Sequence, residues 1–275
     1  METKFADAQV DGSTMIRSVM SLSGGMDSTS LLLRLLAEGS KVTCLTYDYG
    51  QKHSIEIDRS KENISYLSDN GYEVEQVIID LKSAMGSFES ALTKQGVVVP
   101  EGHYESEQMK QTVVPNRNAI FSSILYGHGL SRSISDDCDV RIALGVHSGD
   151  HEIYPDCRPE FYESLERSFS IGNWDSERVS FYLPYISGDK TTILEDAIES
   201  CDRLSIDFYT VFSNTNTSYN PDEQGRSSGR SGADVERILA FHNIGRIDPV
   251  EYIVDWASVL EYALSQDSDG GLQNE

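Results

Sequence analysis

The chain has 275 residues, of which 39% are hydrophobic, a size and composition suited to one globular domain with additional loops. Its 45 acidic and 22 basic residues give a formal net charge of -23, which argues against sequence-independent binding to a polyanion. No apolar run approaches the roughly 18 residues that span a bilayer, and the polar start lacks the apolar core of a signal peptide. We therefore expect a cytoplasmic protein without direct nucleic-acid binding or a membrane segment.

Strands and helices alternate in the first half of the chain. The apolar spacing predicts strands at 16–22, 41–47, 74–79 and 139–146 and helices at 28–37, 55–70 and 118–131. This alternation is typical of a parallel sheet with helices on both faces, so the predicted fold class is α/β with a doubly wound sheet.

The second half is less regular. Its patterns predict helices at 159–170, 190–201 and 233–241, a structured loop at 214–232, and a disordered tail at 266–275. The four cysteines form no C-x-x-C pair, which favours reduced thiols over a disulfide framework or a zinc knuckle.

The turn "SGGMDS" lies between the first predicted strand and helix. A glycine-rich strand-to-helix turn directs backbone N–H groups and the positive end of the helix dipole at one point, which suits a phosphate. Gly24 and Gly25 permit the tight path, Ser23 and Ser28 add hydroxyls, and Asp27 could hold Mg²⁺ on the phosphates of ATP. The alternative is an ordinary turn in which Asp27 is only an N-cap.

This turn resembles the PP-loop of the N-type ATP pyrophosphatases, which split ATP between its α and β phosphates. Four later segments resemble, in order and spacing, the QueC family: "TYDYGQKHSIEI", "VVPNRNAIF", "GVHSGDHEIYPDCRPEF" and "LPYISGDKTTIL". The resemblance implies a single domain over 1–265, with a PP-loop nucleotide-binding core at about 15–150 and a substrate-binding part at about 151–265.

The resemblance also implies an ATP- and Mg²⁺-dependent reaction on 7-carboxy-7-deazaguanine. The family adenylates the carboxylate, lets ammonia displace AMP to give an amide, and then converts the amide into a nitrile with a second ATP. Because both reactants are anions, the site must position them and neutralise their charge.

The site residues follow from matching segments. Those expected to act in catalysis are Asp27, Lys190 and Arg117. Those expected to bind ATP are Ser23, Gly24, Gly25, Asp27, Ser28, Tyr47, Gln51, His53 and Lys190, with Asp27 as the Mg²⁺ ligand. Those expected to bind the deazaguanine are Arg117, Asn118, Tyr154, Asp156, Arg158, Glu160 and Phe161.

Structural alternatives exist for most of these residues. Arg117 and Asn118 could tie a loop to a helix start, and Asp156, Arg158 and Glu160 could form a local ion-pair cluster. The same ambiguity holds for the rings of Tyr47, Tyr49 and Tyr154, which could stack on a base or pack in the core, and for the loop histidines His53, His147 and His151. Cys157 is better explained as a packed thiol than as a nucleophile, because acyl-adenylate chemistry needs none.

One segment departs from the family. QueC proteins carry four zinc-binding cysteines near the C-terminus, and the matching positions here are Ser218, Ser228, Ser231 and Asp234. Because serine stays protonated near neutral pH, we expect zinc to be absent. We also expect hydrogen bonds from Asn214, Asn216, Arg226 and Arg230, together with caps at Ser231 or Asp234, to hold this loop.

The departure leaves three functional hypotheses. We favour a defence-associated, CBASS-type form that joins the deazaguanine by an amide to the N-terminal amine of a partner protein. The first alternative is the housekeeping 7-cyano-7-deazaguanine synthase, which uses ammonia and serves queuosine-type modification. The second is a catalytically silent nucleotide sensor. A homodimer is left open as an assembly.

Overall fold

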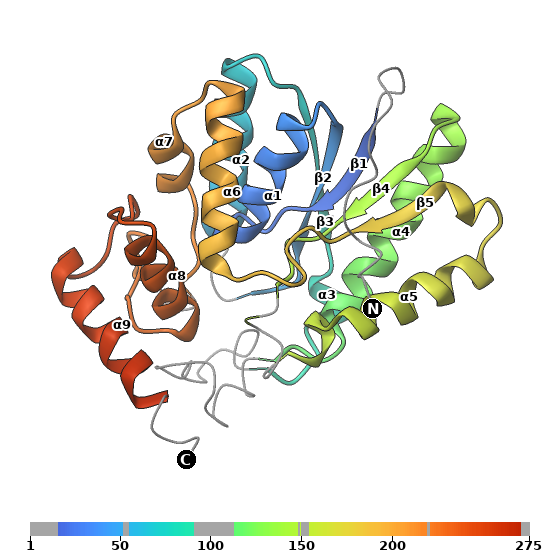
Figure 1. Ribbon diagram of the computed structural model, residues 1–275. Helices are drawn as coiled ribbons and strands as arrows, with labels where there is room; N and C mark the ends of the chain where they lie inside the picture. The colour runs from blue at the N-terminus through green and yellow to red at the C-terminus, as the bar shows by residue number, and fades with distance from the viewer. Residues whose placement is uncertain are drawn as a thin grey trace.

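Five parallel strands form the centre of the protein. The computed structural model describes residues 16–51, 55–90, 113–147, 149, 154–218 and 221–270. Its strands are β1 (Arg17–Ser21), β2 (Lys41–Asp48), β3 (Val74–Asp80), β4 (Val140–Ala143) and β5 (Val179–Tyr182). They lie in the order β3-β2-β1-β4-β5, and every neighbouring pair is parallel (Figure 1). The predicted doubly wound α/β fold is confirmed.

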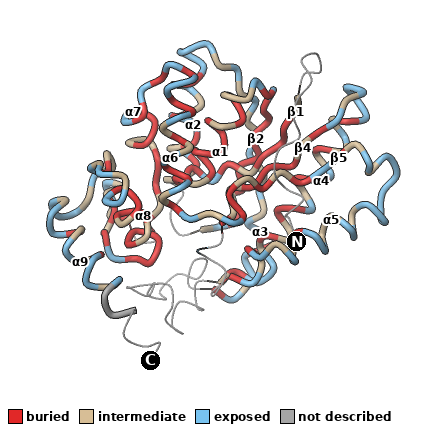
Figure 2. The backbone as a smooth tube through the Cα atoms, viewed as in Figure 1, coloured by how far each residue is buried: buried red, intermediate tan, exposed pale blue. Residues whose placement is uncertain are grey.

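Helices cover both faces of the sheet, because neighbouring strand residues point to opposite sides. Val19 packs into one apolar core and Met20 into the other. The helices α1 (Met26–Ala37), α2 (Ile55–Asp69) and α6 (Lys190–Leu204) lie on the Met20 side. The helices α4 (Arg117–Asp136) and α5 (Pro159–Gly172) lie on the Val19 side. Figure 2 shows buried residues concentrated on the strands and on the helix surfaces that face them.

The C-terminal part adds a smaller layer of helices. It contains α7 (Phe208–Ser213), α8 (Gly232–Asn243) and α9 (Trp256–Gly270). The short helix α3 (Lys82–Met85) does not belong to this layer and is a single turn directly after β3. Val259 and Ala263 of α9 pack against Val235 and Ile238 of α8. Residues 266–270, the start of the predicted disordered tail, continue α9, while 271–275 lie outside the described residues, so the disordered tail stays a prediction. No helix in the described ranges is long and apolar enough to cross a membrane.

The strand order places a crevice beside β1. The chain runs outward from β1 through β2 to β3 on one side and from β4 to β5 on the other, so the order reverses between β1 and β4. Loops at the carboxyl ends of such strands diverge and leave room for a ligand. The predicted strand at 139–146 is too long, because it ends at Ala143 and the following residues leave the sheet at this crevice.

Candidate active site

A cavity opens at the carboxyl ends of β1, β2 and β4. Nine of the residues predicted for the site line it: Ser23, Gly25, Asp27, Ser28, Tyr47, Gln51, Arg117, Asn118 and Lys190. They come from the loop after β1 and the start of α1, from β2 and the loop after it, and from the first residues of α4 and α6, so the fold gathers most of the predicted site in one place. Residues from the C-terminal half also line it, from loops, a single 3-10 turn and the start of α8: Leu144, Gly145, Val146, Cys157, Asn216, Thr217 and Ala233.

The glycine-rich turn is held by its own serines. The Ser28 hydroxyl accepts from the Ser23 backbone N–H at 3.1 Å and lies 2.9 Å from the Ser23 hydroxyl. Gly24 has φ +86°, a left-handed conformation that favours glycine, and a Cβ there would lie 2.1 Å from the Glu56 carbonyl oxygen. Gly25 is the N-cap of α1, so the alternative interpretation of Asp27 as an N-cap is wrong.

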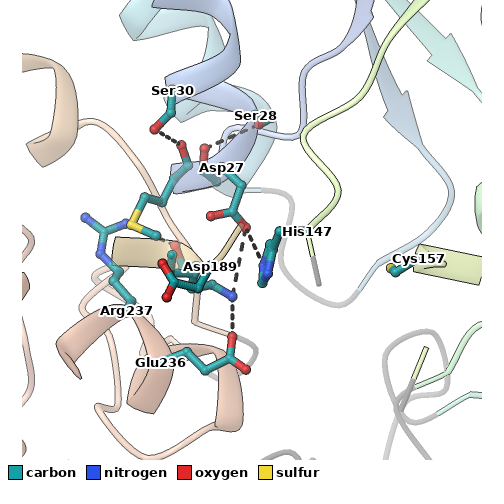
Figure 3. Close-up of polar contacts among 12 residues, drawn as sticks. Asp27, Ser28, Ser30, His147, Cys157, Asp189, Glu236 and Arg237 are labelled. Carbon is teal, nitrogen blue, oxygen red and sulfur yellow. Dashed lines mark hydrogen bonds and ion pairs between the residues drawn. The ribbon is translucent and has the colours of Figure 1, made fainter. Parts of the chain in front are cut away.

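Asp27 instead projects from the first turn of α1 toward two cationic or ionisable groups. Its Oδ2 atom lies 3.9 Å from Lys190 Nζ and 3.8 Å from His147 Nε2. Figure 3 shows the Asp27 carboxylate directed at the His147 ring. Lys190 also forms an ion pair with Glu236 of α8. Two carboxylates thus share one ammonium, which itself is buried. Neither Lys190 nor His147 comes within ordinary hydrogen-bond distance of Asp27.

The other carboxylate oxygen of Asp27 bears on metal binding. Asp27 Oδ1 is buried and accepts no hydrogen bond from any described residue. A buried carboxylate oxygen without a donor is costly unless a ligand satisfies it, and oxygen is the donor that Mg²⁺ prefers. The surroundings of Asp27 Oδ1 therefore fit a divalent cation such as Mg²⁺. No group of three or more His, Cys, Asp or Glu that could hold a metal occurs among the described residues.

Aromatic rings form another wall of the cavity. Tyr47 stacks on Phe121 with ring centroids 4.0 Å apart and an interplanar angle of 8°, and its hydroxyl donates to the Phe121 carbonyl at 3.0 Å. Gln51 donates to the Tyr47 carbonyl at 3.2 Å and accepts from the Tyr49 N–H at 3.0 Å. The tyrosines are thus packed and also line the cavity, so the two interpretations of Tyr47 and Tyr49 do not exclude each other.

Arg117 brings a second charged group to this wall. It lies at the start of α4, where its backbone N–H donates to the Val114 carbonyl at 3.2 Å, and its guanidinium hydrogen-bonds to Tyr49. Glu56, in the first turn of α2, also lines the cavity. Burial raises the pKa of Glu56 to about 8, although the nearby Arg117 charge acts to lower it. The sequence did not predict Glu56 as a site residue, although it lies in "YGQKHSIEI", a segment that resembles the QueC family.

The remaining predicted substrate residues lie around the start of α5. Asn118 Nδ2 lies 3.8 Å from Cys157 Sγ and connects α4 to this segment, and the Cys157 thiol is buried. Arg158 and Glu160 are exposed, and the residues that line the cavity do not include them or the other members of this set: Tyr154, Asp156 and Phe161. Gly24 is likewise absent from the lining. His53 and His151 lie outside the described residues.

The four residues at the family's cysteine positions meet in one cluster, which we call the Asp234 cluster (Ser218, Ser228, Ser231 and Asp234); all but Ser228 are buried. The three serine hydroxyls donate to Asp234 Oδ2 at 3.0, 2.9 and 2.9 Å, and the Ser231 N–H donates to it at 3.1 Å. Ser231 is the N-cap of α8 and forms a capping box with Asp234, as predicted. Neutral hydroxyls already bonded to the only carboxylate are a poor donor set for zinc, so the residues present do not fit the family's metal.

Other bonds hold the same loop. Asn216 Nδ2 donates to the Ser218 carbonyl at 3.2 Å, and Arg226 Nε donates to Asp222 at 2.8 Å. The Arg230 guanidinium lies over the Tyr262 ring, 5.1 Å from the ring centroid. The expected hydrogen bonds of Asn216 and Arg226 are therefore present.

A buried arginine, Arg237, which the sequence did not predict as important, holds the residues that precede Ser218 by hydrogen bonds. Arg237 of α8 makes two hydrogen bonds to the Asp248 carboxylate, at 2.6 and 2.8 Å. Its remaining guanidinium nitrogen, Nη1, donates to the Thr215 hydroxyl at 2.7 Å and to the Thr217 hydroxyl at 3.0 Å. Because Thr217 lines the cavity, this network ties the cavity wall to the interior of the C-terminal layer.

Comparisons with known proteins agree with this architecture. The family model described as "Queuosine biosynthesis protein QueC" matches residues 17–245. The 7-cyano-7-deazaguanine synthase of Caldicellulosiruptor saccharolyticus is 39% identical over 243 residues, which cover 88% of this chain and 98% of that protein. The 7-cyano-7-deazaguanine synthase of Methanoregula boonei is 37% identical over 237 residues, 86% of this chain and 99% of that protein.

A solved structure is also similar at a lower level. The structure of NMN synthetase from Francisella tularensis matches with a TM-score of 0.38 and 13% identity, covering 92% of this chain and 85% of that chain. This likeness is too weak to support a conclusion about the site.

Proposed function

We propose that this chain, which belongs to the QueC family, is an ATP-dependent enzyme that converts 7-carboxy-7-deazaguanine and ammonia into 7-cyano-7-deazaguanine. One observation supports the proposal beyond family membership. Asp27, Lys190 and Arg117 come from three different helices and line one cavity at the carboxyl ends of the central strands. A site that couples two anions needs such a convergence of charged groups.

The proposed chemistry begins with an adenylated carboxylate. A carboxylate oxygen attacks the α-phosphate of ATP, pyrophosphate leaves, and the resulting acyl-adenylate can release AMP when ammonia attacks. The glycine-rich turn would hold the phosphates with backbone N–H groups, and Lys190 would offset part of their charge. Asp27 is the residue that would hold Mg²⁺, which when bound neutralises charge on phosphate oxygens.

The carboxylate substrate would lie on the Arg117 side of the cavity. Arg117 offers a guanidinium to a carboxylate or phosphate, and the rings of Tyr47 and Tyr49 offer flat surfaces for a base. Asn118, Tyr154, Asp156, Arg158, Glu160 and Phe161 stay proposals for contacts with the deazaguanine. Arg158 and Glu160 could take part only if the exposed start of α5 closes over the ligand.

A second candidate function has a specific observation in its favour. The Asp234 cluster replaces the family's cysteines, and the same region supplies Asn216, Thr217 and Ala233 to the cavity wall. A rebuilt wall could admit the N-terminal amine of a partner protein in place of ammonia, so that the reaction stops at an amide. The named relatives are 7-cyano-7-deazaguanine synthases, and for this reason we place the nitrile product first and a defence-associated conjugation second.

The experiment that tests the proposal is pyrophosphate exchange into ATP in the presence of 7-carboxy-7-deazaguanine, followed by mass spectrometry of the products. The nitrile should form with ammonia, and an amide-linked protein should form only if the second candidate is correct. Absence of exchange at every substrate concentration would contradict both and leave a nucleotide sensor. We further propose that the chain folds and acts without zinc, because the Asp234 cluster bonds to itself.

A further inference from the structure

Glu56 is a carboxylate of the cavity wall that the proposed chemistry has not used. The residues that line the cavity include two carboxylates among the described part of the chain, Asp27 and Glu56. The carbonyl oxygen of Glu56 packs so closely on Gly24 that a Cβ there would lie 2.1 Å away. This contact fixes the first turn of α2 against the phosphate-binding turn, so Glu56 is held at a constant place relative to a bound nucleotide.

The neighbours of Glu56 set its chemistry. Arg117 is the cation that faces its carboxyl, and Tyr49, which accepts a hydrogen bond from Arg117, is the other titratable group beside it. Burial raises the pKa of Glu56 to about 8 despite the opposing charge of Arg117. A carboxyl group that gains and loses its proton near neutral pH is well matched to general acid–base catalysis, whereas an ordinary carboxylate is a weak base.

We propose that Glu56 accepts the proton of the attacking amine in the amide-forming step. The inference rests on the function proposed above. The lone pair of ammonia attacks the acyl carbon, the bond from that carbon to the AMP oxygen breaks, and AMP leaves with the bonding electrons. The nitrogen, which carries one proton too many, transfers it to the Glu56 carboxylate and so becomes the neutral amide. Arg117 beside Glu56 places the proton acceptor next to the group that would hold the substrate carboxylate.

The test separates the two half-reactions in Glu56→Gln. Adenylation, followed as pyrophosphate exchange, needs no proton acceptor for an amine, so it should stay within about threefold of the wild type. Amide formation from ammonia should fall about 100-fold, in the range expected for loss of a general base. Hydroxylamine, a stronger nucleophile that is unprotonated at neutral pH, should recover much of this rate. Glu56→Asp, which keeps a carboxylate with a shorter reach, should recover part of it.

A pH series distinguishes a base from a residue that only positions Arg117. With the concentration of unprotonated ammonia held constant, wild-type amide formation should rise through about pH 8, because the carboxylate form is the active one. This rise should be absent in Glu56→Gln. Asp58→Asn is the matched control, since Asp58 lies in the same turn of α2 but is exposed and pairs with Lys61, and both half-reactions should be unchanged.

The possible results are distinct. Equal losses of exchange and of amide formation in Glu56→Gln would make Glu56 a structural support of the nucleotide site and overturn the inference. An unchanged rate of amide formation would overturn it as well. Absence of pyrophosphate exchange in the wild-type protein would instead remove the proposed function, and the inference with it.

Discussion

Asp27 and Asp234 occupy similar positions and have opposite surroundings. Each lies in the first turn of a helix, and each has one buried Oδ1 atom without a hydrogen bond among the described residues. The difference is at Oδ2. In Asp234 that atom accepts four hydrogen bonds of 2.9 to 3.1 Å, whereas in Asp27 the nearest cationic or ionisable groups lie 3.8 and 3.9 Å away.

The two carboxylates therefore differ in role: Asp234 stabilises a loop, whereas Asp27 is available to a ligand. At the Asp234 cluster the Oδ2 atom and the three serine hydroxyls satisfy one another, so these bonds hold the loop together. Asp27 Oδ2 lies 3.9 Å from Lys190 and 3.8 Å from His147, beyond ordinary hydrogen-bond distance, and this leaves capacity for phosphate and Mg²⁺ in the proposed function. Variants of the two residues should therefore have opposite signatures, one in activity and the other in stability.

The largest effect is expected for Asp27→Asn. The change keeps the shape of the side chain but removes the charge that would hold Mg²⁺, so pyrophosphate exchange should fall about 1000-fold, which corresponds to about 4 kcal/mol. The melting temperature should change by less than about 3 °C, because Asp27 makes few bonds to lose. Exchange within tenfold of the wild type would show that Asp27 is not part of the site.

Asp234→Ala should have the largest effect on stability. It removes the acceptor of three serine hydroxyls, of which those of Ser218 and Ser231 are buried, and half of the capping box of α8. Because each orphaned donor costs about 1 kcal/mol or more, the free energy of unfolding measured with urea should fall by about 3 to 4 kcal/mol. A loss below about 1 kcal/mol would show that the cluster does not hold the loop.

The pH dependence of stability should reveal the ionisation of the same carboxylate. Burial raises the pKa of Asp234 in the folded protein, so between the unfolded and folded pKa values the folded state holds the extra proton. Its contribution to stability is then complete below the unfolded pKa and is lost as the pH rises through the folded one, by at most about 1.4 kcal/mol per pH unit.

The measurement is the difference in unfolding free energy between the wild type and Asp234→Asn from pH 4 to pH 8. Asparagine cannot ionise, so other titrating groups cancel and only the Asp234 contribution is left. The wild-type advantage should decrease with pH. An advantage that grows with pH would mean that the four hydrogen bonds outweigh burial and lower the pKa.

The smallest expected effect is that of removing metal. Because the three serine hydroxyls of the Asp234 cluster are bonded to Asp234 Oδ2, we expect no free energy of folding to depend on zinc there. Treatment with EDTA should leave the melting temperature unchanged, and protein purified without a chelator should contain less than about 0.1 equivalent of zinc. Tightly bound zinc in stoichiometric amount would contradict the proposed self-contained cluster.

Local sequence determined much of this protein. The order of strands and helices up to β4 follows from apolar runs and helical spacing that lie within a few residues of one another. The glycine-rich turn predicts its own path, because Gly24 takes the left-handed conformation that a side chain would resist. The four positions of the Asp234 cluster could likewise be located from the spacing of the family's cysteines, and the capping box at Ser231 from its sequence.

Tertiary structure decided the rest, because those properties depend on segments that are distant in sequence. The helical end of the chain is stabilised by the apolar surface of α8, and β5 by its pairing with β4, which no local pattern reveals. Arg237 is an ordinary helix residue until Asp248 and the threonines enclose it. The proton affinity of Glu56 and the contacts of Asp27 with Lys190 and His147 arise in the same way, since burial and charge separation are set only when the layers pack.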